Sequence, residues 1–156
     1  MLFRSELLNE IVIEGLRILE ECLRPGLAAS SPHERLLSMA DDYLRFALEQ
    51  PRYFDFAFLA PSHRVGGISE EITRGNWVVF RLAVEQVGAC IEEGVFKKDD
   101  PMQIAVTIWA EVHGLITLYR TGRLGLDDRQ FRTIYRRAVR RVLRGLMTEA
   151  ALARER

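Results

Sequence analysis

The stretch that decides the fold is DPMQIAVTIWAEVHGLITLYR, residues 100–120. Asp100 is a good N-cap, Pro101 suits the first helical position, and the glycines at 122 and 125 end the run, so the segment predicts a helix. Its apolar residues occupy more than one face, and a helix that is apolar on two sides needs two partners. The two sets are Ile104, Ile108, Leu115 and Leu118 against Ala105, Trp109, Val112 and Ile116.

Outward from this segment, the spacing of apolar residues predicts helices throughout the chain. Residues 52–59 alternate as a strand would, but no second strand candidate exists, so a short helix is favoured there. A loop is expected at 60–67. The predicted helices cover residues 2–23, 32–50, 52–59, 68–93, 101–120 and 127–150. We therefore expect an all-α protein, an antiparallel bundle of about six helices forming one domain over residues 1–156.

Composition narrows the classes of function. Lys plus Arg and Asp plus Glu both number 22, so the formal net charge is zero, which gives no electrostatic reason to expect nucleic-acid binding by this chain. There is no apolar run of membrane-spanning length and no signal peptide. Cys22 and Cys90 are far apart in the sequence, and we expect both to be reduced thiols in the core. We expect a cytoplasmic protein without a membrane partner.

No arrangement of residues predicts catalysis, a metal site or a cofactor. His33, His63 and His113 lie in three different segments without the spacing of zinc ligands. Gly66 and Gly67 are not followed by the Lys-Ser/Thr of a phosphate-binding loop, and no GxSxG motif occurs. The chain is therefore expected not to be an enzyme and to hold neither metal nor cofactor.

The helix predicted at 127–150 is rich in arginine, and two interpretations are open. It could be a nucleic-acid-binding arm, or a solvated face whose side-chain stems cover apolar neighbours, which we favour. Its arginines are Arg129, Arg132, Arg136, Arg137, Arg140, Arg141 and Arg144.

The order of several short motifs resembles the regulatory domain of a known family. Trp109-Ala-Glu-Val-His113-Gly114-Leu115 lies in the helix opened by Asp100-Pro101, upstream stands Tyr43-Leu-Arg-Phe-Ala-Leu-Glu-Gln-Pro51, and Glu93-Gly94-Val-Phe96 lies between them. Together they resemble the C-terminal domain of TetR-type bacterial transcriptional regulators, most closely the branch with a Trp-His-Gly signature. The resemblance covers essentially the whole chain.

The resemblance implies a division of roles. Residues 2–23 would be the helix that connects the sensor to a DNA-binding domain, and residues 101–150 would form a four-helix bundle with a second subunit. Such regulators begin with a helix-turn-helix domain that this sequence lacks, in either a truncated chain or a naturally short relative. DNA would then be bound only through that absent domain.

Two sets of site residues follow from the resemblance together with the distribution of aromatic and apolar side chains. A pocket for a small apolar effector is expected to contain aromatic and branched residues with His113 as the polar contact, and 60–67 as its rim. The predicted pocket residues are Phe46, Phe54, Phe58, Phe80, Trp109, Val112, His113 and Ile116. The predicted homodimer interface comprises Ala110, Gly114, Thr117, Phe131, Ile134, Tyr135, Ala138, Val142 and Leu146.

Two other functions were weighed against a dimeric ligand sensor. An enzyme is disfavoured because no residue set has catalytic roles to assign. A pure interaction module, which pairs with itself or with intact regulators and binds no ligand, would have a tightly filled core.

Overall fold

The computed structural model describes the backbone of residues 2–59 and 70–154, and the side chains of Leu7, 10–59 and 78–154. Every regular element in these ranges is helical, which confirms the all-α class. The elements are α1 (Leu2–Leu23), η1 (Pro25–Ala28), α2 (Pro32–Glu49), α3 (Pro51–Phe54), η2 (Asp55–Leu59), α4 (Glu70–Glu92), α5 (Pro101–Arg120), α6 (Asp128–Leu146) and α7 (Glu149–Arg154). The predicted loop at 60–67 lies outside the described residues.

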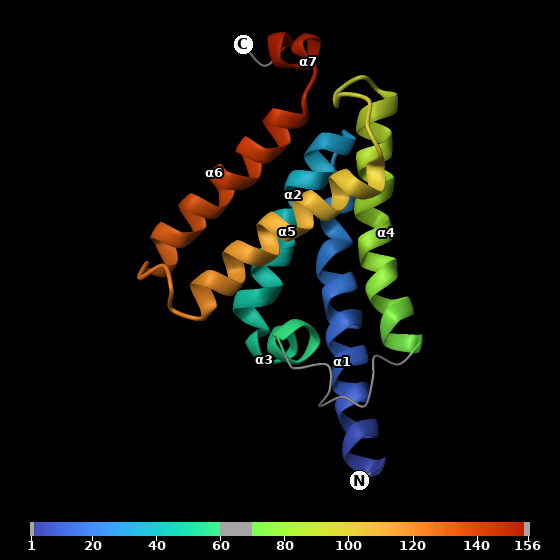
Figure 1. Ribbon diagram of the computed structural model, residues 1–156, viewed down its shortest axis with the longest axis vertical. Coiled ribbons are helices and arrows are strands. Elements are labelled where there is room, and N and C mark those ends of the chain that lie inside the picture. The colour runs from blue at the N-terminus through green and yellow to red at the C-terminus, as the bar shows by residue number, and fades with distance from the viewer. Residues whose placement is uncertain (1, 60–69, 155–156) are drawn as a thin grey trace.

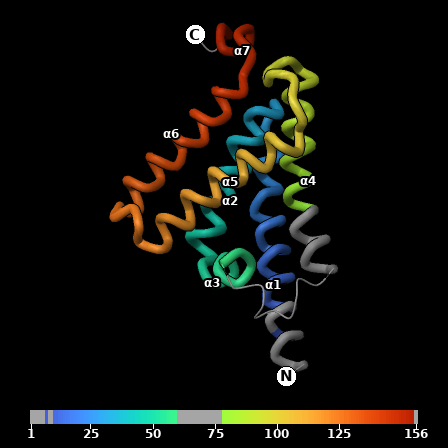
Figure 2. The backbone as a smooth tube through the Cα atoms, viewed as in Figure 1, coloured from blue at the N-terminus to red at the C-terminus, as the bar shows by residue number. Residues whose placement is uncertain are grey.

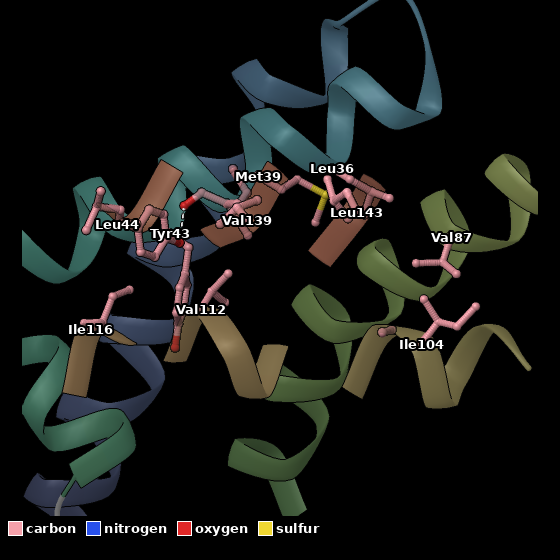
Figure 3. Close-up of a cluster of buried hydrophobic side chains, with 14 of the residues drawn as sticks. Leu36, Met39, Tyr43, Leu44, Val87, Ile104, Val112, Ile116, Val139 and Leu143 are labelled. Carbon is pink, nitrogen blue, oxygen red and sulfur yellow. Dashed lines mark hydrogen bonds between the residues drawn. The ribbon is translucent and has the colours of Figure 1, made fainter. Parts of the chain in front are cut away.

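The helices form two layers that share α2 (Figures 1 and 2). In the first layer, α1, α2 and α4 pack against one another, and α5 crosses in front of them in contact with α2 and α4. In the second, α6 returns antiparallel to α5 and packs against both α5 and α2. One large hydrophobic core runs through both layers, with Tyr43, Val112 and Val139 among its labelled members (Figure 3).

The predicted caps begin the helices as expected. The Ser31 side chain accepts a hydrogen bond from the backbone N–H of Glu34, and Asp100 accepts from two N–H groups in the first turn of α5. Asp127 and Gln130 form a reciprocal capping box at the start of α6. Gly94, at φ 69°, ends α4 in a left-handed conformation, which places the next backbone N–H groups on the last carbonyls of α4.

Pro51 ends α2 as predicted and leaves a carbonyl without its usual donor. Residue 51 would normally donate to the carbonyl of Ala47, but proline has no N–H. Nη1 of Arg120, at the end of α5, donates to that carbonyl instead, at 3.1 Å. Nη2 of Arg120 lies 2.8 Å from both carboxylate oxygens of Asp55. The arginine thereby fastens the corner of α2, α3 and η2 to α5.

Residues 52–59 are helical, so the strand alternative is not realised. The chain continues from the single turn of α3 directly into the π-helical turn η2. This turn carries Phe58 to the inner side of the bundle, where it packs on the core.

The prediction of a single helix over 127–150 is wrong at the C-terminal end, because the helix ends at Leu146 and Met147 is not helical. Met147 is extended and pairs with Phe96 in an isolated antiparallel bridge. Two backbone hydrogen bonds hold the crossing, from Lys97 N–H to the Leu146 carbonyl and from Thr148 N–H to the Val95 carbonyl. The Thr148 hydroxyl then caps α7 by accepting from Ala151 N–H. The side chains of Met147 and Phe96 are both buried in the core.

Candidate ligand-binding cavity

A cavity of about 340 Å³ opens between α1, α2, α4 and α5. Each of these helices contributes to its walls, and η2 contributes one ring. The lining residues are Leu19, Leu23, Leu36, Met39, Ala40, Tyr43, Phe58, Val79, Phe80, Ala83, Met102, Ala105, Val106, Ile108, Trp109 and Val112. Such a size and lining are typical of sites for small apolar molecules.

Three alanines on three different helices contribute to the wall of the cavity. Ala40 of α2, Ala83 of α4 and Ala105 of α5 all line it. A methyl group covers little of the space between helix axes about 8–10 Å apart, whereas a leucine would fill it. The rim is apolar as well, since Met102, Val106 and Trp109 remain more than two-fifths exposed.

Four of the eight predicted pocket residues line the cavity: Phe58, Phe80, Trp109 and Val112. The rings of Phe58 and Phe80 lie 6.5 Å and 5.9 Å from that of Trp109, centroid to centroid. They come from η2, α4 and α5, so elements distant in sequence build one wall.

The other four predicted residues lie beside the cavity rather than in its wall. Phe46, Phe54 and Ile116 are at most 1% exposed and are packed into the core. His113 stacks on Phe54 with ring centroids 5.6 Å apart. It reaches the cavity indirectly, through its contacts with the wall residues Tyr43, Phe58 and Trp109.

Tyr43 is the polar residue of the cavity that sequence reasoning did not assign. It extends from α2 toward α5 (Figure 3), where its hydroxyl lies 2.9 Å from Nδ1 of His113. Burial raises the pKa of Tyr43 and lowers the pKa of His113. Both groups are therefore uncharged near neutral pH, and the pair adds polarity to the cavity without adding charge.

The remaining unassigned wall residues were visible only as ordinary core positions. Leu19 and Leu23 of α1, and Leu36 and Ala40 of α2, recur at the spacing of buried apolar residues on an amphipathic helix. Periodicity marks which face is buried but gives no sign that the buried face borders a void. The rim predicted at 60–67 lies outside the described residues.

The predicted interface residues fall into two groups. Phe131, Tyr135 and Ala138 are buried in the core of the chain itself, and the Tyr135 hydroxyl donates to the Ala40 carbonyl at 2.7 Å. Ala110 and Ile134 are exposed, and the others are half-buried, namely Gly114, Thr117, Val142 and Leu146. Leu118, which the prediction left out of the interface, is 40% exposed. Only the exposed and half-buried residues offer surface to another molecule.

The arginine-rich face of α6 lies at the surface of the described structure. Arg132 pairs with Asp128 of its own helix, and Arg136 pairs with Asp41 of α2. The apolar stripe of α6 packs inward on α5 and α2. This arrangement agrees with the solvated-face interpretation.

Within residues 2–59 and 70–154, no three His, Cys, Asp or Glu side chains are grouped as a metal site would require. None of the helices in these ranges combines the length and apolar character needed to cross a membrane. The chemistry that the cavity offers is apolar contact with one neutral tyrosine–histidine pair, which suits binding.

Comparison with known proteins finds a matching family model and solved structures of similar fold. The family model described as "Tetracyclin repressor-like, C-terminal domain" matches residues 36–142. A solved protein of unknown function from Rhodococcus sp. RHA1 is 23% identical and superimposes with a TM-score of 0.80, over 93% of this chain and 74% of its own. That similarity concerns the fold. No curated protein matches the sequence.

Proposed function

The chain belongs to the tetracyclin repressor-like C-terminal domain family, and on that premise we propose that it is the sensor of a TetR-type transcriptional repressor. In this proposal it binds a small, mostly apolar effector and pairs with a second copy of itself. DNA binding is then the property of a helix-turn-helix domain, which the effector controls through this one.

The cavity is the observation that carries the ligand-binding part of the proposal. It lies between four long helices, its wall is apolar, and its rim leaves Met102, Val106 and Trp109 open to solvent. A well-formed apolar pocket with few polar groups is the usual form of a small-molecule site. An interaction-only module has no need of such a space, so the cavity favours the sensor over that alternative.

In this proposal, the effect of ligand binding is transmitted to the DNA-binding domain through α1. Leu19 and Leu23, near the C-terminal end of this helix, are at most 2% exposed and form part of the cavity wall. A ligand that presses on them changes which position of α1 is most stable, and differential affinity for two positions is what shifts a conformational equilibrium. In the resemblance described above, this helix connects the sensor to the DNA-binding domain.

The proposed dimer uses the outer surfaces of α5 and α6. Ala110 and Leu118 of α5 and Ile134 of α6 are exposed on helices that lie antiparallel to each other. Exposed large apolar side chains on adjacent helices are typical of surfaces that pack against a partner. A two-fold axis would bring the same surface of both copies together.

The ligand-binding part is tested by thermal melting with a panel of apolar compounds. A true effector raises the melting temperature by mass action in the unmodified chain. Trp109→Ala, which removes a wall residue, should abolish the rise, whereas Ile134→Ala, which is remote from the cavity, should retain it. A rise of the same size in both variants would place binding elsewhere.

The dimer is tested by sedimentation equilibrium. Ile134→Glu and Leu118→Glu place a charge on the proposed interface and should shift the chain toward monomer. Ile13→Glu, similarly exposed but on α1, is the matched control and should leave the association constant unchanged. A monomeric unmodified chain at micromolar concentration would overturn the dimer.

A further inference from the structure

One row of side chains along α5 joins the rim of the cavity to the surface proposed for the dimer. Residues four apart on an α-helix form a continuous ridge that is inclined to the helix axis. On α5, which crosses the front of the bundle (Figure 1), the outward-facing ridge comprises Met102, Val106, Ala110, Gly114 and Leu118. Its first two members line the cavity, whereas its last three do not. The cavity and the outer surface of α5 therefore share one ridge.

The ridge is exposed without being charged. Met102, Val106 and Leu118 are 42%, 47% and 40% exposed. The charged side chains of α5 are Glu111 and Arg120, and neither belongs to the ridge. On α6, by contrast, the exposed face is rich in arginine. Depletion of charge marks the centre of a protein–protein interface, so the ridge has the character of a surface that another molecule covers.

Gly114 lets a second helix come close to the middle of the ridge. No atom lies within 4 Å of the position that a Cβ would take there, so the fold of a single copy does not require a glycine. Glycine lowers helix stability relative to alanine, and what it offers in return is close approach of another backbone. From Gly114 to Val106 the rise along α5 is about 12 Å. A helix that crosses at about 20°, as in most helical bundles, remains within side-chain reach of the rim over that distance.

We propose that a second copy of this chain packs along the ridge and covers the rim, so that the effector cavity is complete only in the dimer. The partner copy then supplies the part of the wall that a single copy leaves open at Met102, Val106 and Trp109. Binding at a site that both copies complete is linked to their association, so effector and dimer strengthen each other. This inference rests on the effector binding and the dimer proposed above and states how the two depend on each other.

The exposure of Trp109 tests the covering of the rim without any ligand. Trp77→Phe leaves Trp109 as the only tryptophan, and acrylamide quenches its fluorescence from the solvent. Quenching should weaken as the protein concentration rises through the dimer dissociation constant, which sedimentation equilibrium measures. The same series on the unmodified chain shows whether the substitution has disturbed association. Equal quenching in monomer and dimer overturns the inference, because the rim is then open in both or covered by the chain itself.

The linkage is measured with N-phenyl-1-naphthylamine, an uncharged apolar fluorophore, and the unmodified chain. Its affinity per site should be at least about tenfold lower when the chain is diluted below its dimer dissociation constant. A saturating concentration of the probe should lower the dimer dissociation constant by the square of that factor, because a dimer has two sites. A dimer dissociation constant that the bound probe leaves unchanged contradicts the inference.

Leu118→Glu separates loss of the partner from damage to the cavity. Leu118 does not line the cavity and lies about 14 Å along the helix from Trp109. The monomeric variant should bind the probe at least about tenfold more weakly than the unmodified dimer does. Ile13→Glu adds the same charge at an exposed position of α1, and it should keep both the dimer and the affinity. Unchanged affinity in monomeric Leu118→Glu overturns the inference.

The outcomes separate this inference from the function beneath it. Equal affinity in monomer and dimer overturns the completion of the cavity by the partner copy and leaves the effector site and the dimer in place. Failure of the probe to bind either form counts against the effector site and against this inference together. An unmodified chain that remains monomeric counts against the dimer and against this inference together.

Discussion

Two adjoining regions of the bundle contain the same kinds of side chain and differ in whether they are filled. Around Phe54 the rings of Tyr43, Phe46, Phe58 and His113 lie within 6.4 Å, centroid to centroid, and Phe54 is fully buried. On the other side of Phe58, the rings of Phe80 and Trp109 border a cavity of about 340 Å³. Aromatic density therefore does not by itself predict a pocket.

The two regions differ in the size of the side chains that surround the rings. Near Phe54 the corner of α2 and α3 is fastened by Arg120, whose guanidinium lies 5.6 Å from the ring centroid of Phe54. The wall of the cavity includes three small residues, Ala40 of α2, Ala83 of α4 and Ala105 of α5, whose methyl groups fill little of the space between the helices. The same type of substitution should therefore change the free energy of unfolding by different amounts in the filled and the open region.

The largest expected difference concerns truncation of a ring. Phe54→Ala should lower the free energy of unfolding by about 3–5 kcal/mol, because it opens a void within a closely packed cluster. Phe58→Ala should cost less, since one side of that ring already faces the cavity and has fewer contacts to lose. Urea denaturation of both variants measures the difference, and equal losses would show that the two regions are packed alike.

Enlarging an alanine should also cost more stability in the filled region than at the cavity. Ala47→Leu, at a position that is 0% exposed in the filled region, should cost about 1–3 kcal/mol through overpacking. Ala105→Leu adds the same atoms beside the cavity, so it should change stability by less than about 1 kcal/mol and abolish ligand-induced stabilisation. Thermal melts with and without a bound probe report both quantities. A large loss of stability in Ala105→Leu would mean that the cavity is not open.

The contacts by which Arg120 holds the filled region to α5 can be removed by a separate substitution. Arg120→Leu should cost about 1–3 kcal/mol, because the Ala47 carbonyl loses its donor and Asp55 loses its partner. Arg136→Leu is the matched control, since its ion pair with Asp41 is half exposed and should contribute less than about 1 kcal/mol. Similar losses in the two variants would remove the special role of Arg120.

The smallest expected effect is a dependence of stability on pH that comes from His113, at the boundary between the two regions. Burial lowers the pKa of His113, so the unfolded chain takes up a proton at a higher pH than the folded chain does. Stability from this residue is fully present above about pH 6.5 and falls as the pH drops below it. The free energy of unfolding measured from about pH 8 to about pH 5.5 should fall less in His113→Gln than in the unmodified chain. Identical slopes would show that His113 titrates normally.

Much of the fold could be predicted from local signals. Asp100-Pro101, Ser31-Pro32 and Asp127 are cap residues whose chemistry acts within a few positions of the chain, and each begins a helix where expected. The end of α6 before Met147 escaped prediction because Phe96, with which Met147 forms an isolated bridge, is some fifty residues away in sequence. Thr148 was its only local signal, as the cap of α7.

The sequence predicted which residues lie near the candidate site, but not which of them line the cavity. The spacing of apolar residues indicated that Phe54, Phe58, Trp109 and Val112 are directed inward, and the structure places them within one part of the bundle. Which of them borders empty space depends on the residues of other helices that face them. That information is carried by no single segment.

The sequence by itself determined the helical class, the helix starts and the buried stripes, because capping and amphipathic periodicity are interactions between residues a few positions apart. Only the tertiary structure decided that Phe54 is enclosed while Phe58 borders a cavity, that Arg120 replaces the donor missing at Pro51, and that Tyr43 meets His113. These outcomes depend on distances between helices far apart in sequence, and small differences in side-chain volume at the points of contact decide whether such helices close or leave space.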